Sequence, residues 1–197
     1  MTVSKPIPSS DTSAVVSEDS VGVFRIDGLT LSVKPQNADV ALLTAGLIVP
    51  VIPLGSGNKV RADKHFQLIL QFENSSGSYS LFPAAVVVRK ESLSSAPVSV
   101  RGPLTRIGFP RELQKTSFGH PWVCSEQGGA MPIQEFTELK LPEKSCVVLE
   151  FSMPTPSPQS EFSVVVGGLK KEGIPLPIID IHFESTKRVS GGWLGGQ

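Results

Sequence analysis

The chain has 197 residues, of which 40% are hydrophobic and 18% are charged, so it can bury a proper core and is not a disordered chain. Its 18 Lys and Arg residues balance its 18 Asp and Glu residues, and the net charge is zero. A neutral chain has no field that attracts nucleic acid or an anionic membrane, whereas near-zero charge promotes self-association.

The N-terminal residues contain no apolar run that could serve as a secretory signal. They are rich in Ser, Pro, Thr and Val, and residues 1–20 are therefore predicted to form a flexible tether. If Met1 is the native start, a cytoplasmic location follows. If a signal has been removed, the protein belongs to the cell envelope.

Two short alternating segments, Val21–Ile26 and Leu29–Val33, flank the dipeptide Asp27-Gly28. Asp-Gly suits the two central positions of a type I′ turn, because both need a positive φ. The pattern predicts a tight hairpin, with a single bulged strand as the alternative.

The segment Val40–Asn58 carries no charge, and its length approaches that of a membrane span. Pro50 and Pro53 argue against a transmembrane helix. We favour a buried strand, Ala41–Val49, followed by an apolar connection; the alternative is an exposed loop that docks on a partner or a lipid surface. The candidate interaction surface comprises Leu47, Ile48, Val49, Val51, Ile52, Leu54 and, from a later loop, Trp122.

The segment His65–Glu73 alternates between large apolar residues and mostly polar ones, which predicts a strand with one buried face. The turn residues Asn74–Ser78 lead into a second β-rich segment, Tyr79–Arg89. This pattern predicts a hairpin at the centre of a sheet. Pro83 lies inside the second segment, so its strand is expected to begin at Ala84 or to lie at an edge or bulge.

The least regular segment, Gly108–Pro132, is expected to be a long loop and a binding surface. Its Trp122 is either an exposed aromatic or a plug on the core, and we favour the plug. The pair His120 and Cys124 lacks a third, orienting group, so we assign no nucleophile. Cys124 and Cys146 could form a disulfide in an oxidising compartment, but we favour two reduced, buried thiols.

Later in the chain, Leu176–Glu184 places three apolar residues on one face of a strand. The other face carries Ile178, Asp180, His182 and Glu184. A metal or acid–base site is one interpretation of this face, and a solvated polar surface is the one we favour.

The polar turn LPEKS, followed by the alternating segment CVVLEF at Cys146–Phe151, resembles the later strands of immunoglobulin-like domains. That resemblance implies an antiparallel sandwich. Trp122 precedes both cysteines, so the Cys…Trp…Cys spacing of true immunoglobulin domains is missing.

The predicted fold is an all-β antiparallel sandwich, immunoglobulin-like or jelly-roll-like, with about eight to nine strands and no long helix. One domain is expected at residues 21–186, followed by a flexible Gly-rich tail at 187–197. No hydrolase, zinc-protease or nucleotide-binding motif is present, so no enzyme activity, cofactor or metal is expected.

The function that we expect is that of a non-catalytic accessory module, which contacts a protein partner or another copy of itself. The first alternative is a peripheral membrane or envelope-tethered domain that uses residues 40–55. An enzyme on a β scaffold, with His182 or His120 at its centre, is a weaker alternative.

Overall fold

The computed structural model describes residues 2–7, 14–16, 22–37, 65–75, 77–108, 122–124, 129–134 and 137–187. These residues form an all-β structure of three antiparallel sheets, and their one helical element is the 3₁₀ turn η1 at Pro83–Ala85. In this part of the chain no helix is long and apolar enough to cross a membrane. The prediction of an all-β, sandwich-like fold without a long helix is confirmed.

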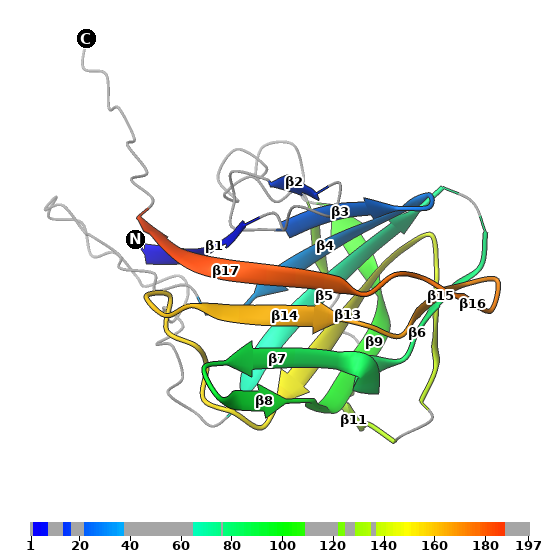
Figure 1. Cartoon of the computed structure of the whole chain (residues 1–197). Coiled ribbons are helices and arrows are strands. Elements are labelled where there is room, and N and C mark those ends of the chain that lie inside the picture. Colours follow the sequence, from blue (N-terminus) through cyan, green and yellow to red (C-terminus); the bar gives the residue numbers. More distant parts are fainter. Residues whose placement is uncertain are drawn as a thin grey trace, which may run out of the picture.

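The first sheet has the strand order β1-β17-β14-β7-β8 (Figure 1). Its strands are β1 (Thr2–Ile7), β17 (Ile179–Lys187), β14 (Phe162–Val166), β7 (Val86–Lys90) and β8 (Leu93–Ser95).

The second sheet has the order β10-β9-β13-β5-β4-β3-β2, with β11 also pairing with β9. Its strands are β10 (Trp122–Cys124), β9 (Pro97–Gly108), β13 (Lys144–Phe151), β5 (Phe66–Asn74), β4 (Leu29–Pro35), β3 (Gly22–Ile26), β2 (Ala14–Val16) and β11 (Met131–Pro132).

A third, small sheet lies at one end of the other two and has the order β12-β6-β15-β16 (Figure 1). Its strands are β12 (Leu139–Leu141), β6 (Tyr79–Leu81), β15 (Leu169–Lys171) and β16 (Ile174–Pro175).

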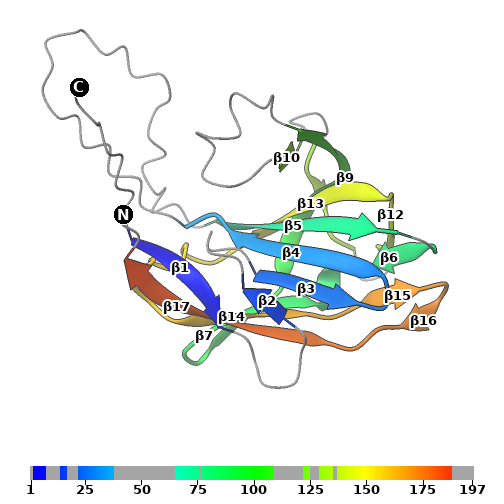
Figure 2. The same ribbon diagram turned by 90° about the horizontal axis from the view of Figure 1, so that it is seen from above.

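The main core lies between the first and second sheets, which form two layers when seen from above (Figure 2). Phe66 and Phe151 reach into it from the second sheet, with ring centroids 5.9 Å apart. Phe162 of the first sheet meets the edge of Phe66 at 6.1 Å and stacks on Phe183 at 4.9 Å. Aromatic rings therefore join the facing layers, as side chains do in a sandwich.

The predicted strand at His65–Glu73 is confirmed as β5, but its predicted hairpin partner is wrong. β5 pairs with β4 and β13 along its length, and the segment Tyr79–Arg89 divides between two other sheets. The division comes at η1, which begins with Pro83. Because proline cannot donate to a ladder, the chain turns there and β7 begins at Val86.

The predicted hairpin around Asp27-Gly28 is confirmed. β3 and β4 pair in register up to Ile26 and Leu29, and both turn residues have positive φ, 46° for Asp27 and 84° for Gly28. This is the backbone that a two-residue type I′ turn requires.

Part of the N-terminal segment that was predicted to be a flexible tether lies in paired strands. β1 pairs with β17, and β2 pairs with β3. Ser4 and Asn37 are both buried; the Asn37 amide donates to Ser4 Oγ at 2.9 Å and to the Pro156 carbonyl at 3.1 Å. The Ser- and Pro-rich composition does not indicate the pairing of β1, because its partner strand β17 lies at the far end of the chain.

Candidate functional site

The apolar residues predicted as an interaction surface, Leu47, Ile48, Val49, Val51, Ile52 and Leu54, lie outside the described residues. The backbone of Trp122, the seventh candidate, begins β10 and pairs with Gly108. Of the predicted loop Gly108–Pro132, the described parts are Gly108 at the end of β9, the two short strands β10 and β11, and the residues just before β11. Strand β11 pairs with β9.

The polar face predicted on β17 is present and exposed. Ile179, Ile181 and Phe183 are fully buried, whereas Asp180, His182 and Glu184 face solvent. The nearest charged partners are single and distant, with His182 Nε2 3.8 Å from Glu161 Oε2 and Asp180 Oδ2 4.0 Å from Arg89.

This arrangement fits a solvated face better than a reactive site. The His182 side chain is about half exposed, with one carboxylate beside it. Among the residues that the structure describes, no group of three His, Cys, Asp or Glu side chains is arranged to hold a metal ion.

The two cysteines are bonded to each other, so the preference for two reduced thiols is wrong. Cys124 of β10 and Cys146 of β13 form a disulfide with their Cα atoms 5.8 Å apart. Local pattern does not indicate this contact, because it forms only when β10 and β13 have both paired with β9. Strand β9 pairs with Cys146 of β13 through Leu104 and with Cys124 of β10 through Arg106. Both cysteines therefore lie beside the same end of β9.

A second apolar cluster surrounds this disulfide. It consists of Leu104, Cys146 and Val148, with Ile69 and Cys124 packed against them. Val147 and Leu149, which alternate with these residues along β13, belong to the main core. The cluster therefore lies on the outer face of the second sheet, where the disulfide ties β10 to β13.

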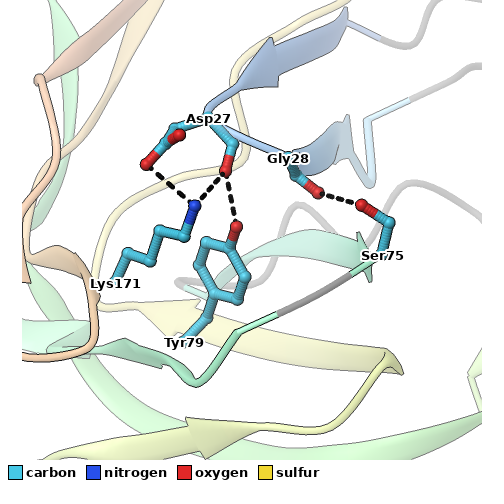
Figure 3. A network of polar contacts seen from close by, with 5 residues as sticks. All are labelled: Asp27, Gly28, Ser75, Tyr79 and Lys171. Carbon is cyan, nitrogen blue, oxygen red and sulfur yellow. Dashed lines mark hydrogen bonds and ion pairs between the residues drawn. The ribbon is translucent and has the colours of Figure 1, made fainter.

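A network of polar contacts holds the hairpin tip of β3 and β4 against the third sheet (Figure 3). The Tyr79 hydroxyl donates to the Asp27 carbonyl at 2.6 Å, and Lys171 Nζ donates to the same oxygen at 3.1 Å. Lys171 Nζ also lies 3.1 Å from the Asp27 carboxylate. The hydrogen bond to that carboxylate raises the pKa of Lys171 above its ordinary value of 10.5, and desolvation opposes the rise.

The other turns at this end are joined by backbone hydrogen bonds. Ser75 N–H donates to Gly28 at 3.3 Å, Asn74 N–H donates to Glu143 at 2.9 Å, and Glu172 N–H donates to Ser78 at 2.8 Å. Side-chain pattern alone cannot reveal this network, because most of its acceptors are backbone carbonyls. The ring of Tyr79 is buried, while its hydroxyl is bonded.

An open hollow of about 460 Å³ lies beside these turns. Its lining mixes both signs of charge, with Arg25 and Lys144 next to Glu73 and Glu143. A small-molecule site is usually concave and mostly apolar. This hollow is wide open and its lining is largely polar and charged, so we assign it no ligand.

Large apolar side chains are exposed at two places on the described surface. The first is the stretch of β8 and β9, together with β11, which pairs with β9; it exposes Leu93, Val98 and Met131. The second is the segment after the β15–β16 turn, where Ile174 and Ile178 are 69% and 70% exposed. Strand alternation predicts Ile178 on the same face as Asp180 and His182, and neither exposed place was predicted from the sequence. The letters IPLPI nevertheless mark an apolar segment at 174–178.

Comparison of the chain with protein-family models, with curated proteins and with solved structures found no match.

Proposed function

We propose that this chain is a non-catalytic β-sandwich module that works through protein–protein contacts, as an accessory or assembly domain. The observation that carries the proposal is that five large apolar residues are 44% to 70% exposed, although the phenylalanines of the core are buried. The five are Leu93, Val98, Met131, Ile174 and Ile178. Single exposed apolar residues are ordinary, but gathered ones mark interaction sites. The zero net charge adds a tendency to associate.

The absence of an enzyme activity belongs to the same proposal. Its support is the lack of a catalytic motif in the sequence and the exposed position of His65 and His182, each beside a single carboxylate. A nucleophile or general base normally needs a third, orienting group and shelter from water.

Size-exclusion chromatography with light scattering tests this function. Three variants each remove one apolar surface: Leu47→Asp with Ile48→Asp and Ile52→Asp, Val98→Ser with Met131→Ser, and Ile174→Ser with Ile178→Ser. We expect the wild type to self-associate or to bind detergent, and at least one folded variant to lose that property. A wild type that stays monomeric and binds no detergent contradicts the proposal.

A second candidate function is that of an envelope-tethered domain, and the disulfide between Cys124 and Cys146 favours it. Structural disulfides persist in oxidising compartments and are rare in the cytosol. Lipid contact through residues 40–55 would be seen as co-sedimentation with liposomes that the Leu47, Ile48 and Ile52 variant loses.

The finer fold description, immunoglobulin-like or jelly-roll-like, is also a proposal. Face-to-face packing of two antiparallel sheets supports both forms. The disulfide weighs against the immunoglobulin form, because it joins β10 and β13 within one sheet path, whereas immunoglobulin domains bridge their two sheets.

A further inference from the structure

The segment 174–178, which we name the proline strap, is the most exposed apolar segment that the structure describes. Ile174 and Ile178 are its two ends, and Pro175 and Pro177 between them also face solvent. At its centre Leu176 is partly buried against the main core, and its N–H donates to the Leu169 carbonyl at 2.8 Å. The strap is therefore held at its centre while both flanks face solvent.

The strap begins at a rigid turn. Glu172 and Gly173 both have positive φ, 51° and 83°, as in a two-residue type I′ hairpin turn. The Glu172 N–H donates to Ser78 at 2.8 Å, which docks the turn on the neighbouring one. A segment held in this way loses little conformational entropy when it binds.

The backbone of the strap can accept hydrogen bonds at its free edge but cannot donate them. β16 is the last strand of the third sheet, and it pairs with β15 through Lys171 and Ile174. Alternation along a strand turns the main chain of residues 174 and 176 toward β15 and that of 175 and 177 away from it. Both outward positions are proline, so neither has an N–H to donate.

This edge excludes one common kind of partner. An added β-strand would have to leave its own carbonyls unpaired along the strap, because no outward N–H meets them. The proline strap is thus protected against strand addition, whereas its apolar side chains remain accessible.

The charges near the strap also disfavour an anionic lipid surface. Lys170 Nζ lies 4.3 Å from the centre of the Phe82 ring, and Lys171 is bonded to Asp27. The hairpin tip itself carries the exposed carboxylate of Glu172. A basic, freely available face, which an anionic surface attracts, is missing from this hairpin.

We propose that the proline strap is a docking site for a partner protein whose groove is lined by Trp and Tyr side chains. Such a groove offers what the strap lacks, because indole N–H and phenol O–H groups can donate to its outward carbonyls. Aromatic rings also pack well against proline and isoleucine, as in the recognition of Pro-rich segments by aromatic grooves. This inference rests on the proposed interaction function and names the chemistry of the partner.

The test uses the full chain with ¹³C-labelled Ile and Leu methyl groups, titrated with N-acetyltryptophanamide and, in parallel, with N-acetylphenylalaninamide. The second probe has an aromatic ring without a ring donor. We expect the Ile174 and Ile178 methyl signals to shift with an apparent Kd about threefold or more lower for the tryptophan probe, as one net hydrogen bond gives. The Leu93 methyls, 63% exposed at the other apolar place, are the internal control.

Several outcomes overturn the inference. Equal affinity for the two probes, or equal shifts at Leu93, would show general apolar adhesion. Strap signals that shift with protein concentration alone would make a second copy the occupant. Binding to anionic phosphatidylserine vesicles that Ile174→Ser with Ile178→Ser abolishes, and Leu93→Ser does not, would make it a lipid surface.

Substitution of the two prolines tests their role at the strap edge. Pro175→Ala with Pro177→Ala restores two outward N–H donors. At equal concentration we expect this variant to reach a higher mass in light scattering than the wild type does. Pro175→Ala with Pro177→Ser, which also carries both donors, should show the same increase. If both donor-bearing variants keep the mass of the wild type, the strap edge is not protected by its prolines. Failure of these strap tests leaves the proposed function standing if the Leu47 or Val98 variants still abolish association.

Discussion

The hydroxyl of Tyr79 donates a 2.6 Å hydrogen bond to the backbone carbonyl of Asp27, which lies 52 residues earlier in the chain. The bond joins the tip of the β3–β4 hairpin, in the second sheet, to the first residue of β6, in the third sheet (Figure 3). Lys171, from a third segment, donates to the same carbonyl.

Tyr79→Phe removes the hydroxyl and keeps the buried ring. We expect the free energy of unfolding to fall by about 1 kcal/mol, because the Asp27 carbonyl keeps Lys171 as a donor. Urea denaturation measures this change. Ser75→Ala, which removes an exposed 3.4 Å hydrogen bond to Gly28, is the control and should change stability by less than about 0.5 kcal/mol. Equal effects of the two substitutions would contradict the role of Tyr79.

Lys171→Met tests the contact with Asp27 through pH. Since the pKa of Lys171 is raised above 10.5 in the folded chain, its contact stabilises the fold fully below that ordinary value. The contribution disappears as the pH rises through the raised pKa and the ammonium loses its proton. We expect the urea midpoints of wild type and variant to differ at neutral pH and to converge in strongly alkaline solution. A difference that persists there would assign the effect to packing of the Lys171 stem.

His182→Ala and Phe183→Ala compare two neighbours on opposite faces of β17. We expect the exposed His182, with its 3.8 Å ion pair, to contribute less than about 0.5 kcal/mol. Phe183, buried and stacked on Phe162 at 4.9 Å, should cost about 3 to 5 kcal/mol when truncated. Thermal or urea unfolding of both variants gives the comparison. A strongly destabilised His182→Ala chain would mean that the outer face of the first sheet is covered.

Cys124→Ala with Cys146→Ala removes the cross-link that joins residues 22 apart. Closing a loop of that length is expected to stabilise the fold by about 3 kcal/mol, chiefly by restricting the unfolded chain. The urea midpoint should fall in the variant, and in the wild type after reduction. Reductant should leave the variant unchanged, which is the control. Two free thiols in unreduced, denatured wild type would show that the bond does not form.

Much of the strand content follows from local pattern. The alternation in β5, in the second half of β13 and in β17 predicts which residues are buried, and Phe66, Leu149 and Ile181 are all fully buried. The dipeptide Asp27-Gly28 predicts its own turn, because few other residues accept two consecutive positive φ values.

The errors share a cause, which is that strand partners are chosen by contacts distant in sequence. The sequence predicted that β5 pairs with the next segment, Tyr79–Arg89, whereas in the structure β5 forms longer ladders with β4 and β13. The pairing of β1 with β17 joins the two ends of the described chain, and no local pattern can indicate it. The disulfide is of the same kind, since Cys124 and Cys146 lie together only when β10 and β13 have both paired with the same end of β9.

By itself the sequence determined the fold class, the exposed polar face of β17 and the sheltered core, because period-two alternation and turn chemistry are local properties. Tertiary structure alone decided the sheet order, the disulfide, the polar network around Asp27 and the exposure of the proline strap. Each of these depends on which backbone groups are already paired, and that is settled when segments far apart in the chain compete for the same hydrogen bonds and the same core.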